Sequence, residues 1–260
     1  MSKRYTWSEL PKGLRSSVES VTGPVLESER ITTWHSDAPF TGALITDTGR
    51  VFAKAAPDHD TATIEQYRRE TLLAPLVTRY AAPLLGRVSE DGWTLLLFGY
   101  VAGGNADLSP GHKDLGYLSA TLRAVQRIRP PHGLALPTLA DQWAEHLNRD
   151  ERSLLSGTHL LHNDLVPSNV MLRYAGYDTQ AVLVDWGRAV LGPAWAEYAG
   201  LYMWLLFSGH DPAQARAWLT RFPAWRMASR AGIRAYVAGA TAECADSPEH
   251  VARWMSLLDR

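Results

Sequence analysis

This sequence has a single cysteine, a formal net charge close to zero and no long apolar run. Cys244 is the only cysteine among 260 residues, so no internal disulfide can form and no cysteine set is available to bind zinc. The formal net charge of -1 gives no electrostatic case for nucleic acid as a main partner. No apolar run reaches bilayer-spanning length, and the N-terminus lacks the apolar segment of a secretory signal. We expect a cytoplasmic protein without a nucleic-acid or membrane partner.

The first hundred residues predict a helix followed by a small antiparallel sheet. The helix starts with Ser8 as its N-cap and ends before Gly23. Short β-rich runs then alternate with tight-turn signals, and a second helix interrupts them. The predicted strands cover residues 30–34, 42–46, 51–55, 84–88 and 93–98, and the second helix covers 61–76.

The rest of the chain is predicted to be mainly helical, with one β-hairpin whose strands cover 169–172 and 181–184. The predicted helices cover residues 113–128, 139–155, 195–207, 212–222, 225–242 and 250–258. The fold class is therefore α+β. With 46% hydrophobic residues, the chain has enough material for two modest lobes or one large domain.

Polar residues gather at the two mouths of the predicted hairpin. His162, Asp164 and Asn169 precede it in the order His-x-Asp-x-x-x-x-Asn, and Asp185 follows it in Asp-Trp-Gly. In kinase-type phosphoryl transfer one Asp accepts the hydroxyl proton, while an Asn and a second Asp hold magnesium on the phosphates. Each motif alone could equally be turn and cap residues. Both motifs in order across a hairpin favour the kinase interpretation.

Lys54 lies in the predicted strand 51–55 between apolar residues. A strand lysine is most often a solvated edge charge, but kinases keep one at this place to grip the nucleotide phosphates. Its partner is then a Glu on the following helix. Glu70 is our choice because it lies deeper in the helix, and Glu65 is the alternative.

A glycine-rich link, Phe-Gly-Tyr-Val-Ala-Gly-Gly at 98–104, follows the last predicted strand of the sheet. Extended backbone there could offer a carbonyl and an N–H to an adenine edge, although a flexible linker predicts the same glycines. We expect an N-terminal nucleotide-binding lobe at 1–98 and a hinge at 99–104. A helical C-terminal lobe with the catalytic hairpin and the acceptor site follows at 105–260.

Three further marks are Trp-x-x-Leu-Pro at 7–11, Val-Asp-Trp at 184–186 and Gly-Pro-Ala-Trp at 192–195. With the motifs above, they make the chain resemble the superfamily of aminoglycoside phosphotransferases and choline kinases. These are kinase-like small-molecule phosphotransferases, and the resemblance runs from the first helix to the helix after Trp195. It implies a protein-kinase-like bilobal fold, with a small antiparallel-sheet N-lobe and a mainly helical C-lobe.

The resemblance also implies roles at the hairpin. Asp164 would be the catalytic base, and Asn169 and Asp185 would be magnesium ligands. His162 would orient the loop structurally. Glu197 stands where relatives often have an Asp that braces the catalytic loop from the next helix.

On the nucleotide side, the resemblance implies that Lys54 and Glu70 form a phosphate clamp. Gly99 and Val101 would present backbone to the nucleobase. The cofactors would be ATP (or GTP) and Mg²⁺.

Three departures matter for the substrate. The loop 36–41 has no glycine, although such a loop usually cradles phosphates with backbone N–H groups, so Ser36 and Thr41 are candidate substitutes. Val166 stands where protein Ser/Thr kinases have a Lys. Only a short stretch separates Asp185 from the helix near Trp195, with no Ala-Pro-Glu. The last two features argue against a conventional protein kinase.

The leading functional hypothesis is phosphorylation of a hydroxyl on a small molecule, with antibiotics as candidate acceptors. One alternative is a peptide Ser/Thr hydroxyl kinase in a natural-product pathway. Another is a degenerate module that binds nucleotide without turnover.

An aminoglycoside pocket would be acidic, but a solvated helix face would explain the same acidic residues. A choline pocket would be a cage of tryptophan rings, but a helical core would explain the same tryptophans. The candidate acids are Asp141, Glu145, Asp150, Glu151 and Asp211, and the candidate tryptophans are at 195, 204, 218, 225 and 254.

Overall fold

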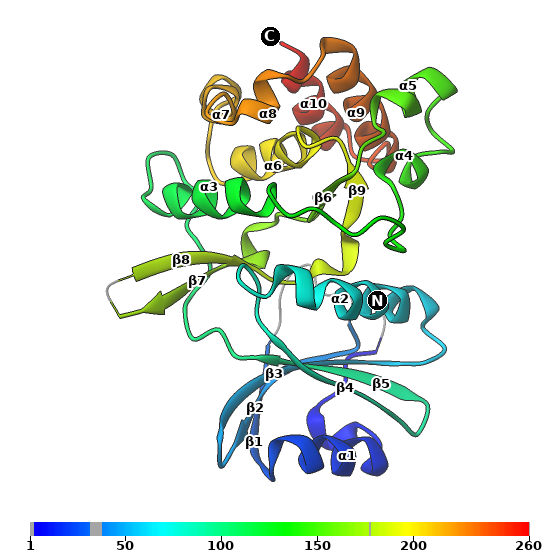
Figure 1. The fold of residues 1–260 in the computed structure, drawn as a ribbon, viewed down its shortest axis with the longest axis vertical. Coiled ribbons are helices and arrows are strands. Elements are labelled where there is room, and N and C mark those ends of the chain that lie inside the picture. The colour runs from blue at the N-terminus through cyan, green and yellow to red at the C-terminus, as the bar shows by residue number, and fades with distance from the viewer. Residues whose placement is uncertain (1–2, 32–37, 177, 260) are drawn as a thin grey trace. The chain divides into compact units, whose positions relative to one another are not determined.

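The structure is a computed structural model that describes residues 3–31, 38–176 and 178–259. The chain separates into two compact units, Met1–Ala102 and Gly103–Arg260. The first unit contains an antiparallel sheet and the second is mainly helical, which confirms the predicted α+β class (Figure 1). Within the described ranges, no helix is both long and apolar enough to cross a bilayer.

The first unit, which we call the sheet unit, is built around five antiparallel strands in the order β1-β2-β3-β5-β4. Helix α1 lies on one face of this sheet and helix α2 on the other (Figure 1). The elements are α1 (Lys12–Thr22), β1 (Val25–Arg30), β2 (Phe40–Thr46), β3 (Gly49–Pro57), α2 (Thr61–Val77), β4 (Leu84–Glu90) and β5 (Trp93–Gly99).

Side-chain alternation along the central strands divides the sheet unit into two apolar clusters. Leu95 and Leu97 of β5 pack in the cluster that contains the buried residues of α1. Leu96 and Phe98 belong to the cluster that contains Tyr67 of α2. In β3, the alanines on either side of Lys54 belong to the α1 cluster. The same alternation therefore directs Lys54 toward α2.

The N-terminal segment differs from the single helix predicted from Ser8. A short 3₁₀ turn, η1 (Trp7–Glu9), is followed by the separate helix α1. Leu10 and Pro11 separate them with extended ψ angles of 151° and 143°. Ser8 is therefore inside the turn, and Pro11 is the residue that precedes α1. The proline cannot supply the N–H that a continuous helix would need here.

Part of the predicted first strand and phosphate loop falls outside the described residues. Strand β1 ends at Arg30, so it precedes the predicted run 30–34, of which 32–34 are not described. Ser36 is also not described. Thr41 lies within β2, where its hydroxyl donates to the Ile31 carbonyl at 2.7 Å. That hydroxyl is therefore engaged with the neighbouring backbone.

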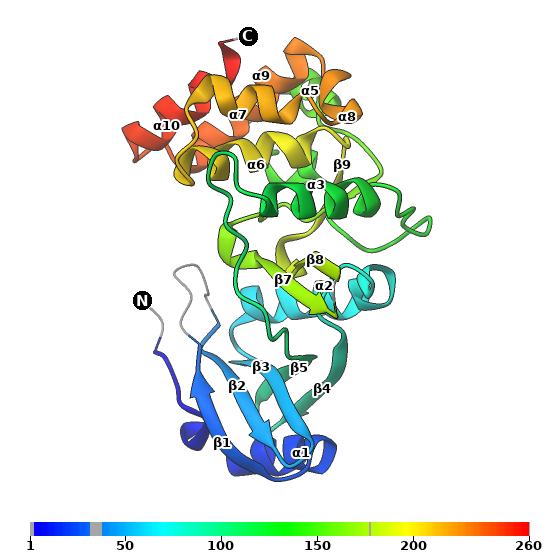
Figure 2. The ribbon, with the colours of Figure 1, turned by 90° about the vertical axis from the view of Figure 1, so that its left-hand side faces the viewer.

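The second unit, which we call the helical unit, contains helix α6, against which several other helices pack, and two small β-pairs (Figure 2). Helix α3 packs along the hairpin formed by β7 and β8, and β6 pairs with β9. The helices are α3 (Asp114–Val125), α4 (Leu139–Gln142), α5 (Arg149–Leu154), α6 (Ala196–Phe207), α7 (Pro212–Leu219), α8 (Pro223–Arg226), α9 (Arg230–Glu243) and α10 (Pro248–Met255). The strands are β6 (His159–Leu161), β7 (Val170–Ala175), β8 (Asp178–Leu183) and β9 (Val190–Gly192).

Two predicted long helices are each split in the structure. The run 139–155 forms α4 and α5, and the run 225–242 forms α8 and α9. Asn148 starts α5 by accepting from the N–H groups of residues 150 and 151, and Ser229 starts α9 by accepting from Gly232 N–H. Apolar residues recur at helical spacing across both breaks, so the sequence predicts one helix at each place, but these N-caps start a second helix there.

Candidate active site

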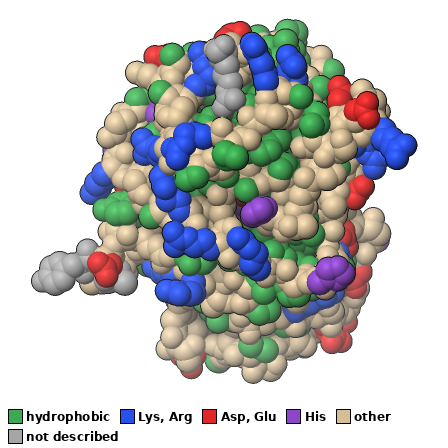
Figure 3. Space-filling view, turned by 45° about the horizontal axis from the view of Figure 1, so that its top comes forward, with side chains coloured by type: hydrophobic (Ala, Val, Ile, Leu, Met, Phe, Trp, Pro, Cys, Tyr) green, Lys and Arg blue, Asp and Glu red, His purple; other side chains and the backbone are tan. Residues whose placement is uncertain are grey.

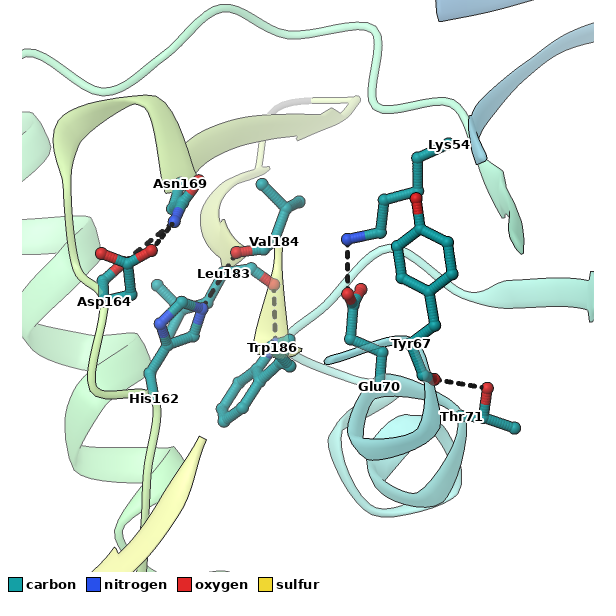
Figure 4. A network of polar contacts seen from close by, with 10 residues as sticks. All are labelled: Lys54, Tyr67, Glu70, Thr71, His162, Asp164, Asn169, Leu183, Val184 and Trp186. Atoms are coloured by element: carbon teal, nitrogen blue, oxygen red, sulfur yellow. Dashed lines mark hydrogen bonds and ion pairs between the residues drawn. The ribbon is translucent and has the colours of Figure 1, made fainter. Parts of the chain in front are cut away.

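The loop between β6 and β7 brings Asp164 and Asn169 together. It ends in the 3₁₀ turn η2 (Pro167–Asn169). The Asn169 amide nitrogen donates to the Asp164 carbonyl at 3.0 Å and to its carboxylate Oδ2 at 3.1 Å (Figure 4). Asp164 is half-buried and Asn169 is buried. The predicted base and the predicted metal-binding amide are therefore neighbours.

His162 and Asn169 both tie this loop to the end of β8. The buried His162 ring contacts the Val184 carbonyl through Nε2 at 2.9 Å, and the Val184 N–H donates to the Asn169 carbonyl at 2.9 Å. The Trp186 ring contacts the His162 ring at an interplanar angle of 59°, with centroids 4.6 Å apart. Asp185 lies between Val184 and Trp186 in a left-handed conformation with φ 65°. The helical unit thus gathers Asp164, Asn169 and Asp185 in one place.

Glu197 of α6 supports the loop from the protein interior. Its carboxylate accepts the backbone N–H groups of His162 at 2.5 Å and Asn163 at 3.1 Å. The residue is only 4% exposed. Burial raises the pKa of Glu197 to about 7, against the two N–H donors, which lower it, while the nearby Asp164 raises it further. The bracing role suggested by the resemblance is thus present in the geometry.

The side chains at this site suit a hard divalent cation. Because the Asn169 amide nitrogen is committed to Asp164, the amide oxygen is the atom that Asn169 can offer a ligand. Asp185 adds a carboxylate. Amide and carboxylate oxygens are the ligands that Mg²⁺ takes in nucleotide sites. Asn169 and Asp185 are therefore the residues that would hold magnesium.

In the sheet unit, Lys54 forms a buried ion pair with Glu70 of α2 (Figure 4). The side chains of Lys54 and Glu70 are only 7% and 4% exposed. Glu65 instead binds Arg68 and Arg69 on the same helix, and the Arg68 hydrogen bonds lower the pKa of Glu65 to about 2. The choice of Glu70 over Glu65 as the partner of Lys54 is confirmed.

Two aromatic rings flank the Lys54 ammonium. Its Nζ lies 5.4 Å from the centroid of the Tyr67 ring and 5.8 Å from that of Phe98. Tyr67 precedes Glu70 by about one helical turn, so α2 supplies both the anion and one ring (Figure 4). Cation–π contacts of this kind stabilise a desolvated ammonium. Sequence reasoning did not identify Tyr67 or Phe98 as neighbours of Lys54.

Gly99 and Val101 lie at the end of the sheet unit. The Gly99 N–H donates to the Pro83 carbonyl at 2.8 Å, so the carbonyl is the group that Gly99 can offer a nucleobase. A Cβ at Gly99 would lie 2.8 Å from the Pro83 ring, which explains why glycine is needed here. Val101 is buried.

The segment after Ala102 runs beside β7. The Leu172 N–H donates to the Gly104 carbonyl at 2.9 Å, and the Ala106 N–H donates to the Val170 carbonyl at 2.8 Å. A Cβ at Gly103 would lie 1.6 Å from the Leu172 carbonyl oxygen, so this glycine permits a close backbone approach. Sequence analysis treated these glycines as part of a hinge, and nothing in the local pattern showed their pairing with β7.

Several residues considered for an acceptor pocket have structural contacts. Asp141 accepts from the Thr138 N-cap and pairs with Arg152. Asp211 caps α7 and Glu151 completes the capping box of α5. The remaining members are the exposed acids Glu145 and Asp150, the buried Trp218 and Trp225, and the half-buried Trp195, Trp204 and Trp254.

Residues 106–233 match the sequence model of the phosphotransferase enzyme family. This match includes the loop with Asp164, the hairpin, Asp185 and Glu197. No curated protein matches the chain.

Solved structures share the fold over most of the chain. A thermostable mutant of the aminoglycoside phosphotransferase APH(4)-Ia has a TM-score of 0.64 at 12% identity, covering 94% of this chain and 98% of that one. The choline kinase LicA from Streptococcus pneumoniae has a TM-score of 0.60 at 10% identity, covering 94% and 97%. APH(3'')-Id from Streptomyces rimosus, in complex with ADP and streptomycin, has a TM-score of 0.58 at 17% identity, covering 92% and 97%. The chain therefore has the fold of aminoglycoside phosphotransferases and choline kinases, and its residues 106–233 match the phosphotransferase enzyme family.

Proposed function

We propose that this protein transfers the terminal phosphoryl group of ATP (or GTP) to a hydroxyl group on a small molecule. The observation that carries the proposal is the convergence of three residues in the helical unit. Asn169 donates to Asp164 through its side chain, and its carbonyl accepts the N–H of the residue before Asp185. Kinases use an Asp, an Asn and a second Asp for phosphoryl transfer, and the proximity of these three residues in the chain's fold supports the proposal.

Asp164 serves as the base in this reaction. Its carboxylate accepts the proton of the acceptor hydroxyl as the oxygen attacks the γ-phosphorus, and a nucleoside diphosphate leaves. The Asn169 amide, which donates to Asp164 Oδ2 at 3.1 Å, keeps one carboxylate oxygen oriented. Asn169 and Asp185 would hold magnesium, which would supply positive charge to the phosphate oxygens.

The sheet unit supplies the nucleotide contacts in this proposal. Lys54, oriented by Glu70, is the cation for the phosphates, and Gly99 and Val101 offer backbone groups to the base. The solved complexes support nucleotide as the donor, because APH(3'')-Id holds ADP and LicA has been solved with AMP. Residues 1–98 would then be the nucleotide-binding part and 105–260 the catalytic and acceptor part.

A polar hydroxyl compound is the acceptor class that the similar solved structures suggest. The named relatives are aminoglycoside phosphotransferases and a choline kinase, and one of them holds streptomycin. We therefore put aminoglycosides and amino alcohols first in an acceptor screen, with sugars and Ser- or Thr-containing peptides after them. The proposal invokes no nucleic-acid or membrane partner.

The test combines thermal stability with ATP consumption. Ligand binding to the native state raises the melting temperature, so ATP should stabilise the protein more with Mg²⁺ than with EDTA. Asp185→Ala should abolish that difference, whereas the exposed Asp178→Ala on the same hairpin should preserve it. ATP consumption with at least one acceptor then distinguishes an enzyme from a nucleotide-binding module. If the ATP-induced rise in melting temperature depends on Mg²⁺ equally in Asp185→Ala and in the parent, Asp185 is not a metal ligand.

A further inference from the structure

Asn163, between His162 and Asp164, has a backbone conformation that few residues adopt. Its φ angle is 62°, in the left-handed region. Non-glycine residues are uncommon there, although Asn tolerates it better than most. The Asn163 N–H donates to the buried Glu197 carboxylate at 3.1 Å. Its backbone is therefore held from the interior while its side chain remains available for a second set of contacts.

The Asn163 side chain uses its amide nitrogen twice. Nδ2 donates to the Gln142 Oε1 at 2.9 Å and to the Arg188 carbonyl at 3.3 Å. An amide nitrogen carries two N–H groups, so each contact can use one of them. Arg188 is the last residue of the 3₁₀ turn η3 (Trp186–Arg188), which begins directly after Asp185. The residue beside the catalytic Asp164 thus bonds to the segment that follows Asp185.

Gln142 is held for this contact by α9. Its Nε2 donates to Glu243 Oε1 at 3.1 Å, and this turns its Oε1 toward Asn163. Gln142 ends α4 and Glu243 ends α9. A chain of side-chain hydrogen bonds therefore runs from the end of α9 through the end of α4 to the catalytic loop. All of its members belong to the helical unit.

We infer that Asn163 is a positioning residue, which sets the separation of the loop carrying Asp164 from the segment carrying Asp185. The inference rests on the proposed phosphotransferase function. A base and a metal ligand must be held in one geometry, and misplacement by about 1 Å can cost on the order of a hundredfold in rate. Glu197 holds the loop through its backbone, and Asn163 adds the tie to η3.

Three substitutions at this residue separate the backbone from the side chain. Asn163→Gly keeps the left-handed conformation and removes the hydrogen bonds. Asn163→Asp keeps the side-chain shape but cannot donate in its ionised form. Gln142→Ala removes one partner and leaves the Arg188 carbonyl. The matched control is Asn148→Gly, which changes the same residue type at the N-cap of α5.

The first measurement is steady-state kinetics with the acceptor identified by the screen. Asn163→Gly and Asn163→Asp should lower kcat by roughly ten- to a hundredfold, because the misplacement affects the transition state. The KM for ATP should stay within about threefold, since a positioning residue makes no contact with the nucleotide. Gln142→Ala should show a smaller loss and Asn148→Gly none. Parental kcat in Asn163→Gly would overturn the inference.

The second measurement needs no turnover. Hydrogen–deuterium exchange should become faster in peptides covering residues 160–166 and 185–189 of Asn163→Gly, and stay parental in Asn148→Gly, because the tie restrains both segments. Parental exchange in both peptides of Asn163→Gly would overturn the tie, and Asn163→Asp, which also removes both donated hydrogen bonds, answers the same question if Asn163→Gly does not fold. A parent that consumes no ATP with any acceptor would instead contradict the proposed function.

Discussion

The Glu197 carboxylate accepts the backbone N–H of His162 at 2.5 Å, from a position that is almost completely buried. It also accepts the N–H of Asn163 at 3.1 Å. The loop that carries Asp164 is therefore bonded to α6, the helix whose residues are among the most buried in the helical unit. These two hydrogen bonds fix the backbone of the short loop between β6 and β7 to the buried helix α6.

The pH dependence of stability should carry the signature of Glu197. Burial raises its pKa from 4.5 to about 7, so between these values the native state binds more protons than the unfolded state. Stability from this group is therefore highest at low pH, falls as the pH rises from 4.5 to 7, and is flat above. Glu197→Gln removes this titration. Over that window the parent should lose on the order of 3 kcal/mol relative to the variant.

Urea unfolding at several pH values between 4.5 and 8 measures this difference. The control is Glu145→Gln, at an exposed glutamate in the same unit, whose unfolding free energy should run parallel to that of the parent. Parallel curves for Glu197→Gln as well would show that Glu197 does not titrate in this window.

Replacing Lys54 should affect both nucleotide binding and stability. A solvated edge lysine, the alternative that the sequence leaves open, could be removed without loss of the fold, but Lys54 is buried against Glu70. Lys54→Ala removes the cation beside a buried carboxylate, which typically costs about 3–5 kcal/mol. The double variant Lys54→Ala/Glu70→Gln avoids that charge and should fold better than Lys54→Ala.

Nucleotide titration separates the two roles of Lys54. We expect the folded double variant to show weaker ATP stabilisation in thermal-shift experiments, and the exposed Lys12→Ala in α1 to match the parent. If the double variant binds ATP as tightly as the parent, Lys54 has only a structural role.

Asp164→Asn should separate chemistry from binding. The amide keeps the size of the carboxylate, and its oxygen can still accept from Asn169, so the loop should be retained. Loss of a general base lowers the rate by about a hundredfold to ten-thousandfold. Nucleotide binding should survive, as judged by Mg²⁺–ATP thermal shifts. Turnover within a few-fold of the parent would exclude Asp164 as the base.

Gly239 of α9 should resist substitution for a steric reason. A Cβ there would lie 2.4 Å from atoms of the buried Trp143 ring, so Gly239→Ala should destabilise the protein by about 1–3 kcal/mol. Gly116 in α3 offers a control, because a Cβ there meets nothing within 4 Å. Gly116→Ala should stabilise by about 0.5–1 kcal/mol through helix propensity. Chemical denaturation of both variants measures the contrast, and equal effects would contradict it.

Helix ends were harder to predict from the sequence than the existence of elements. Four strands of the sheet and helix α2 follow from alternation, turns and periodicity in their own residues, whereas the first strand was predicted at 30–34 and β1 is Val25–Arg30. The run 139–155 kept helical periodicity although Asn148 begins a second helix inside it. The pair β6 and β9 was missed, because its three-residue strands are too short for a periodic signal.

The sequence by itself determined the kinase-type motifs, their order around a hairpin, and hence the fold class and the candidate residues Lys54, Asp164, Asn169 and Asp185. These depend on local patterns and spacing, which can be read directly from the amino-acid sequence. Only the tertiary structure decided that Lys54 pairs with Glu70 and not Glu65, and that Asn163 bonds to Gln142 and Arg188. Such contacts depend on which helix face is buried and on how distant segments pack, and no local pattern encodes either.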